Sequence, residues 1–167
     1  TAKIVGLAAI KYGDLSNQAS KDYVFDIERF TSFEGDTGPY ILYTIVRIKS
    51  ILAKYAEQGG KVAEAVLKEA VNDSEKALMM QLAQFNAMMQ VACDEAAPHK
   101  ICAYIYDLAN AFNHFYHETK ILTEEDEAKK AGNKQLIAEI KAELKTISNE
   151  AYAIKGEIKQ ARRESQK

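Results

Sequence analysis

Residues 33–52 read FEGDTGPYILYTIVRIKSIL, a polar turn that runs directly into a long apolar helix, and this stretch decides the fold around it. The turn ends at Pro39, which suits the first turn of a helix because an N–H has no intrahelical partner there. Either Asp36 or Thr37 can cap the helix with a side-chain oxygen. The helix is expected to run to about Gln58, where two consecutive glycines end it.

One face of this expected helix combines aromatic rings with a positive charge. Tyr40, Tyr43 and Arg47 stand at positions i, i+3 and i+7, which a helix brings to one side. Tyrosine rings can stack on unpaired bases, and an arginine can hold a phosphate. The alternative is that the tyrosines are core or boundary residues whose hydroxyls reach the rim of the protein.

The composition indicates a helical protein without strong overall charge. The chain has 167 residues, of which 47% are hydrophobic, with two prolines, eight glycines and no tryptophan. These values favour one all-α domain, with or without an appendage, over a strand-rich fold. The net charge of −2 means that any contact with RNA has to come from a local patch. No apolar run approaches the length of a membrane span.

The sequence predicts no catalytic residues, no cofactor and no metal. It contains no nucleophile elbow, no phosphate-binding glycine loop and no paired-histidine zinc motif. His114 and His117 with Glu118 could form a surface metal site, but scattered ligands of this kind are more often solvent-facing side chains. Cys93 and Cys102 match no metal spacing, which favours a reducing compartment and a cytoplasmic location.

Further helices follow from apolar spacing and capping residues. We expect a loop over 13–21, a capped acidic helix start at 123–126, and helices at 3–12, 22–33, 61–71, 74–97 and 98–118. Asn72 is the expected cap of the helix over 74–97, because it places Glu75 at the third helical position in an approximate capping box.

The expected helix 74–96 is rich in alanine and methionine, and apolar residues occupy nearly its whole circumference. Flexible methionine side chains around an aromatic ring suit an adaptable protein-binding face. The candidate interface residues are Met79, Met80, Phe85, Met88 and Met89. The alternative is that this segment is a fully buried central helix.

The end of the chain carries a heptad pattern. The apolar seam consists of Ile137, Ile140, Leu144, Ile147, Ala151, Ile154, Ile158 and Ala161. The flanking positions carry Glu143, Glu150 and Glu157 on one side, and Lys141, Ser148, Lys155 and Arg162 on the other. This charge pattern is typical of a parallel coiled coil and predicts possible self-association. The alternative is that the seam packs against the bundle of its own chain and the charges are solvated.

Two parts of the chain resemble a known family. The motifs KYGDLSN, KDYVFDIERF and FEGDTGPYILYTIVRI fall within Ile4–Tyr55, and APHKICAYIYDLANAFNHFYHETKILTEEDEA spans Ala97–Ala128. They resemble the C-terminal anticodon-binding (DALR-type) domain of arginyl-tRNA synthetases. The resemblance implies an all-α helical bundle of the class I synthetase anticodon-binding type with a long C-terminal helix, and tRNA-Arg as the partner. The positions it implies for RNA contact are Thr37, Tyr40, Tyr43 and Arg47.

The resemblance also implies that the chain is not an enzyme by itself, because nothing in it resembles the catalytic domain. Lys129-Lys130 follow Asp126-Glu127-Ala128, where the family signature has Leu-Arg. We therefore expect an anticodon-binding-like bundle over 1–130, and a replaced heptad helix over 131–167 that packs on the bundle or projects. The simple helix-forming composition of the departing segments suggests an engineered or redesigned derivative. The alternative function is an engineered scaffold that binds a protein partner through helix 74–96 or the C-terminal helix.

Overall fold

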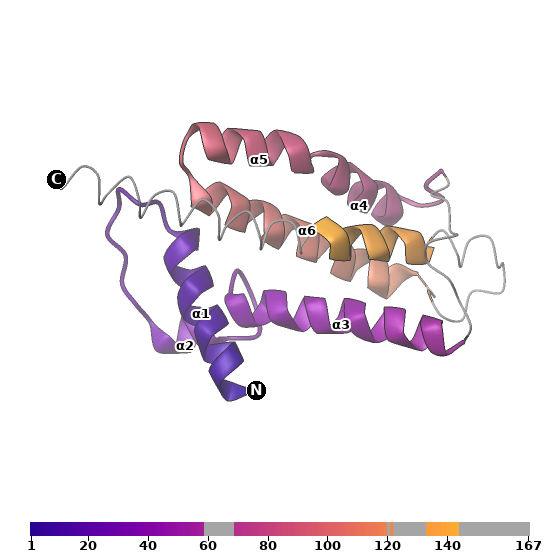
Figure 1. Cartoon of the computed structure of the whole chain (residues 1–167), viewed down its shortest axis with the longest axis horizontal. Coiled ribbons are helices and arrows are strands. Elements are labelled where there is room, and N and C mark those ends of the chain that lie inside the picture. Colours follow the sequence, from indigo (N-terminus) through magenta and orange to yellow (C-terminus); the bar gives the residue numbers. More distant parts are fainter. Residues whose placement is uncertain (59–68, 120, 122–132, 144–167) are drawn as a thin grey trace.

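The computed structural model describes residues 1–58, 69–119, 121 and 133–143. Within them it is all-α, as predicted, and contains no strand. The helices are α1 (Ala2–Ser16), α2 (Ile27–Thr31), α3 (Gly38–Glu57), α4 (Asp73–Ala83), α5 (Phe85–Asp94) and α6 (Pro98–Glu118). Residues 133–143 are also helical. Figure 1 shows α6 along the middle of the bundle, with α3 on one side and the α4–α5 pair on the other.

The start of α3 follows the sequence pattern in detail. Thr37 is the cap: its hydroxyl oxygen accepts a hydrogen bond from the Tyr40 backbone N–H at 3.2 Å and donates to the Ser32 carbonyl at 2.6 Å. Pro39 lies in the first helical turn, as expected. The helix ends with Gln58 as its C-terminal cap. The two glycines predicted to end it lie outside the described residues.

The predicted cap of the next helix is also confirmed. The Asn72 side chain accepts a hydrogen bond from the Glu75 backbone N–H at 2.8 Å. In return, a Glu75 carboxylate oxygen accepts one from the Val71 backbone N–H at 2.8 Å. The single helix expected over 74–97 is wrong, because Gln84 separates α4 from α5. No glycine or proline stands at this break, so no local signal in the sequence marks it.

The helix expected over 22–33 is wrong for most of its length. Only α2 is helical there, and it starts late because the Asp26 side chain caps it by accepting from Arg29 N–H at 3.1 Å. The aromatic residues whose spacing suggested a longer helix pack together in a cluster instead. The rings of Tyr23 and Phe25 pack on Phe30, with centroids 6.0 and 4.9 Å away.

Two other predicted boundaries differ from the structure. The first helix extends beyond the expected residues 3–12 and takes in part of the predicted loop 13–21. Residues 69–71 are not helical, whereas 61–68 of the helix predicted over 61–71 lie outside the described part of the chain. The acidic helix start predicted at 123–126 lies outside it as well.

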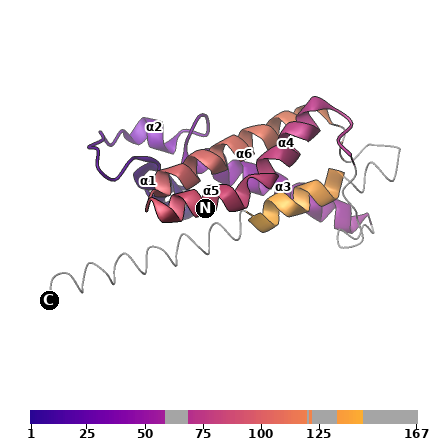
Figure 2. The same cartoon turned by 90° about the horizontal axis from the view of Figure 1, so that it is seen from above.

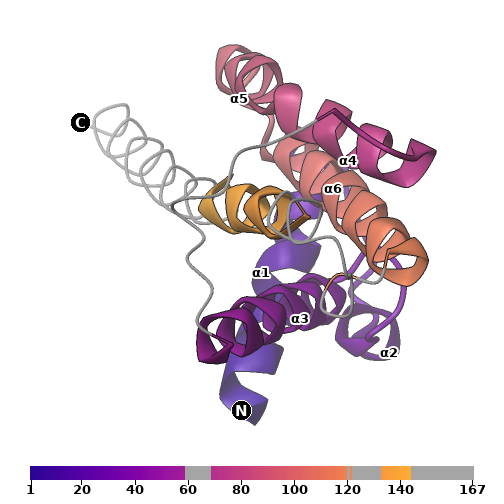
Figure 3. The same cartoon turned by 90° about the vertical axis from the view of Figure 1, so that its right-hand side faces the viewer.

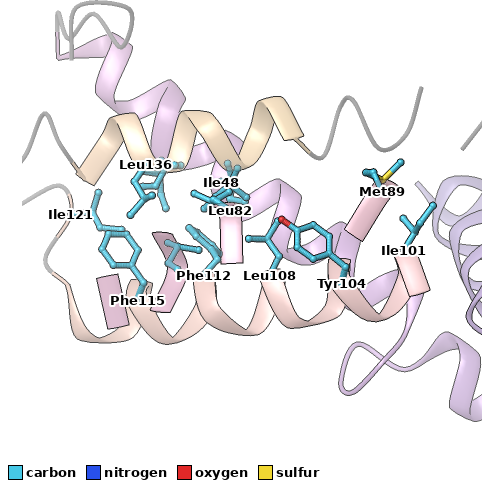
Figure 4. Packing of buried hydrophobic residues seen from close by; sticks show 14 of the residues in the cluster. Ile48, Leu82, Met89, Ile101, Tyr104, Leu108, Phe112, Phe115, Ile121 and Leu136 are labelled. Carbon is cyan, nitrogen blue, oxygen red and sulfur yellow. The ribbon is translucent and has the colours of Figure 1, made fainter. Parts of the chain in front are cut away.

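The core forms where α6 meets its neighbours. Its largest members from α6 are Tyr104, Leu108, Phe112 and Phe115, packed with Ile48 and Ile51 of α3 and Leu78 and Leu82 of α4 (Figure 4). Leu136, Ile137 and Ile140 complete this cluster. Figure 3 shows the helical residues 133–143 between α3 and the α4–α5 pair, alongside α6. The first two heptad seam positions are thus buried in the bundle, and those from Leu144 onward lie outside the described residues.

Figures 1 and 2 place α1 and α2 together at one end of the bundle. Among the helices that the structure describes, none combines the length and the apolar character needed to cross a membrane.

Candidate nucleic-acid interface

An arginine lies between two aromatic rings where α3 faces α6. The guanidinium carbon of Arg47 is 4.7 Å from the ring centroid of Tyr43 and 4.6 Å from that of Tyr116. Both distances fall within the range of cation–π attraction. Tyr43 and Arg47 come from successive turns of α3, and Tyr116 comes from the last turns of α6. The tertiary packing of the two helices therefore builds this sandwich.

Hydrogen bonds fix the guanidinium in this position. Arg47 Nη2 donates to the Tyr43 hydroxyl oxygen at 2.7 Å, and Nη1 donates to Asn113 Oδ1 at 2.6 Å. Within the part of the chain that the structure describes, no carboxylate forms an ion pair with Arg47. The positive charge is therefore held by neutral partners, and no carboxylate among the described residues cancels it.

Beneath the sandwich, amide side chains tie α3 to α6. Asn113 Nδ2 donates to the Tyr40 hydroxyl oxygen at 2.8 Å and to Thr44 Oγ1 at 3.2 Å. The Tyr40 hydroxyl in turn donates to Asn110 Oδ1 at 2.8 Å. These bonds leave the Tyr40 hydroxyl engaged on both sides. Tyr40 is partly buried and supports the site from below, whereas the Tyr43 side chain is 49% exposed.

Three of the four residues implied for RNA contact therefore belong to one cluster, and Thr37 does not. The Thr37 side chain is only 5% exposed, and its hydroxyl is used twice in capping α3. This burial disagrees with the expected RNA-facing role and assigns Thr37 to the start of the helix.

The sequence analysis did not single out Asn110, Asn113 or Tyr116 as site residues. Their signal is the presence of two amides three residues apart within the locally apolar stretch LANAF of residues 108–112 and the Asn113 that follows it. Buried amides need hydrogen-bond partners, so such a pair points to a polar contact across a helix interface. The sequence alone does not say that the partners lie about 70 residues away, on α3.

The methionine-rich segment contributes mostly to the core. Met89 is buried in the hydrophobic cluster, and Met79, Phe85 and Met88 are partly buried against it. Met80 is 55% exposed and is the one interface candidate that lies open to solvent. The placement of the other four matches the alternative of a buried helix and disagrees with a broad methionine surface.

Other ionisable groups show no reactive arrangement in the described residues. Burial, followed by the nearby Asp36 carboxylate, raises the pKa of the Cys102 thiol to about 12. His114 Nδ1 lies 3.5 Å from a carboxylate oxygen of Glu118, and both side chains are exposed. No group of three or more potential metal ligands is found in the described ranges.

Comparison with known proteins gives a consistent result. Residues 41–153 match the family described as the DALR anticodon binding domain. The chain is 69% identical over 129 residues to an arginine–tRNA ligase of Agathobacter rectalis. The aligned region covers 76% of this chain and 22% of the relative. It is 56% identical over 127 residues to that of Alkaliphilus oremlandii, covering 76% and 22% of the two chains.

The fold is similar as well. The arginyl-tRNA synthetase of Thermus thermophilus superposes with a TM-score of 0.77 at 28% identity, covering 89% of this chain and 25% of that one. The present chain thus spans about a quarter or less of the proteins it matches. The family match extends to residue 153, well into the region predicted to be a replaced segment. Nothing in these findings supports an engineered derivative.

Proposed function

Because the chain belongs to the DALR anticodon binding domain family, we propose that it is the anticodon-binding part of an arginine–tRNA ligase and binds tRNA-Arg. The observation that carries the proposal is the Arg47 guanidinium held between Tyr43 and Tyr116 without a carboxylate partner among the described residues. The Arg47 guanidinium can bind a phosphate there. The half-exposed ring of Tyr43 beside it can stack on an unpaired base.

The residues divide into those that contact RNA and those that hold them. Tyr43, Arg47 and Tyr116 form the contact surface. Tyr40 and Asn113 fix its geometry through hydrogen bonds across α3 and α6. Exposed lysines at 49 and 54 add positive charge along α3, which a chain of net charge −2 needs for a local RNA site.

Aminoacylation is assigned in this proposal to the larger part of the ligase, which the present chain does not span. The chain itself binds and positions RNA and needs no cofactor for that task. The proposal includes a cytoplasmic location, with which the exposed unpaired thiol of Cys93 is compatible.

Fluorescence anisotropy with a labelled anticodon stem-loop of tRNA-Arg tests the proposal. Tyr43→Ala removes the stacking ring and is expected to weaken binding by about 1–2 kcal/mol, which is about 5- to 30-fold. Tyr43→Phe keeps the ring and should retain most of the affinity. Tyr23→Ala makes the same chemical change at a partly exposed tyrosine that lies outside the site around Arg47, and it serves as the matched control.

Equal affinity of the unmodified chain for this stem-loop and for an unrelated stem-loop of the same length would refute the proposed function. The alternative function is a scaffold that binds a protein through helix 74–96 or the C-terminal helix. Met80 is the single exposed candidate in helix 74–96. The C-terminal helix from Leu144 onward lies outside the described residues, so no specific observation favours this alternative.

A further inference from the structure

The hydrogen bonds that join α3 to α6 have a direction that can be followed from Arg47 outward. The guanidinium of Arg47 has only donors, so the Asn113 atom that it contacts at 2.6 Å is the amide oxygen. The Asn113 NH2 group therefore faces the other way. It donates to the Tyr40 hydroxyl oxygen at 2.8 Å and to Thr44 Oγ1 at 3.2 Å. Arg47 thus fixes the orientation of the Asn113 amide.

The same direction is passed on to Asn110. The Tyr40 hydroxyl oxygen accepts from Asn113, and the single hydroxyl proton donates to Asn110 Oδ1 at 2.8 Å. The opposite orientation of the Asn110 amide would direct two NH2 groups at one hydroxyl and would deprive its proton of this acceptor. The amide oxygen of Asn110 is therefore occupied, and the NH2 group is the part that faces away from Tyr40.

The Asn110 NH2 group is accessible to a ligand. Asn110 is partly exposed, and its Nδ2 atom is not among the buried polar atoms that lack a partner in the described part of the chain. The partly exposed ring of Tyr106, one turn earlier on α6, packs on that of Tyr40 with the centroids 5.8 Å apart. An aromatic surface therefore adjoins the amide donors. A base that stacks on such a surface presents its edge to polar groups beside the ring.

We infer that Asn110 is a specificity-determining residue whose NH2 group donates to a carbonyl oxygen of an unpaired base in the bound RNA. An unconstrained asparagine reads adenine with its oxygen and its NH2 group together. At Asn110 the Tyr40 hydroxyl holds the oxygen, which excludes that pairing. The base selected is one with a carbonyl oxygen, O4 of uracil or O6 of guanine, where cytosine and adenine carry an amino group. This inference rests on the RNA binding of the proposed function and adds selection among bases to it.

Anisotropy titrations with a set of tRNA-Arg stem-loops test the inference. Each anticodon position carries each base in turn. The base preference is the ratio of affinities within a pair, uracil against cytosine or guanine against adenine. Asn110→Asp keeps an oxygen for the Tyr40 hydroxyl and replaces the NH2 group by a second acceptor. Asn86→Asp makes the same change at an exposed position of α5 and is the matched control. An added negative charge by itself weakens binding of all stem-loops alike and leaves the ratios unchanged.

The unmodified chain is expected to prefer the carbonyl-bearing base by about 2- to 10-fold at one anticodon position, which is the effect of one hydrogen bond. Asn110→Asp should abolish or reverse this preference at that position alone, and Asn86→Asp should retain it. Thermal unfolding verifies that the variants are folded, and the preference of the unmodified chain tests the inference without any variant.

Uniform weakening by Asn110→Asp, with all ratios unchanged, would overturn the inference, because it assigns the contact to a phosphate. The absence of a carbonyl preference in the unmodified chain would overturn it as well. So would a preference for the amino-bearing base at the position that Asn110→Asp affects. Each of these results leaves the proposed function intact, since that function fails only if the chain binds an unrelated stem-loop equally well.

Discussion

Asn113 joins Arg47 through a 2.6 Å hydrogen bond from Nη1 to the amide oxygen, so that a neutral side chain of α6 orients a cation of α3. An aspartate at this position could accept the same bond, but it would neutralise the guanidinium. The amide also donates to Tyr40 and Thr44, which a carboxylate cannot do. Asn113 thereby holds the geometry of the cluster and preserves its charge.

Asn113→Asp is accordingly expected to weaken binding of the tRNA-Arg stem-loop by roughly tenfold. Because the substitution cancels one phosphate-binding charge, the slope of log affinity against log salt concentration should fall by about 1. Anisotropy titrations at several salt concentrations measure both quantities, and thermal unfolding verifies that the variant is folded.

The matched control for this variant is Asn86→Asp, which makes the same charge change at an exposed position of α5. It should leave the salt slope unaltered. If Asn113→Asp is folded and shows unchanged affinity and slope, Arg47 does not contact a phosphate.

Thr37→Ala is expected to affect stability and not RNA affinity. Loss of the cap at the start of α3 should reduce the free energy of unfolding by about 1 kcal/mol. Thr37→Ser keeps the hydroxyl and should lose little. Urea unfolding measures the stability, and stem-loop titration well below the melting temperature measures the affinity. A fall in RNA affinity without a loss of stability would show that Thr37 contributes to RNA binding.

Two glycines of α1 should respond in opposite directions to alanine. Gly13→Ala would place Cβ against the buried Phe30 ring and is expected to cost about 1–3 kcal/mol of unfolding free energy. Gly6→Ala meets no atom within 4 Å and should stabilise the helix by about 0.5–1 kcal/mol through reduced backbone entropy in the unfolded chain. Urea denaturation of both variants checks the signs. Stabilisation by Gly13→Ala would show that α1 does not pack this closely on Phe30.

Glu143 makes the stability of the bundle depend on pH. Burial, reinforced by the charge of Glu139, raises the pKa of its carboxyl from 4.5 to about 7, although the hydrogen bond from Tyr104 acts in the opposite direction. Between pH 4.5 and 7 the unfolded chain releases this proton while the folded chain retains it. The contribution of Glu143 to the free energy of unfolding therefore decreases as pH rises through that window.

Glu143→Gln removes this titration. The difference in unfolding free energy between variant and unmodified chain should therefore increase in favour of the variant from pH 5 to pH 8. Tyr104→Phe removes the bond that lowers the pKa of Glu143, so the window should extend to higher pH. Urea unfolding at several pH values tests both, and a difference that is independent of pH for Glu143→Gln would contradict the assignment.

The local features of the fold could be predicted because they depend on neighbouring residues. Thr37 and Pro39 specify where α3 begins, and Asn72 with Glu75 specifies where α4 begins. The break at Gln84 was missed because no turn-forming residue marks it. The length of the helix around Phe30 was overestimated because aromatic residues that cluster in three dimensions can imitate helical spacing.

The sequence by itself determined the helical class, the caps and the alignment of Tyr40, Tyr43 and Arg47 on one face of α3, because these follow from backbone geometry over a few residues. Only the tertiary structure decided that Asn113 and Tyr116 complete the cluster, that Thr37 is buried, and that α1 leaves Ile4 and Leu7 exposed. Those outcomes depend on how distant helices pack, and side-chain periodicity along one helix carries no information about which helix will face it.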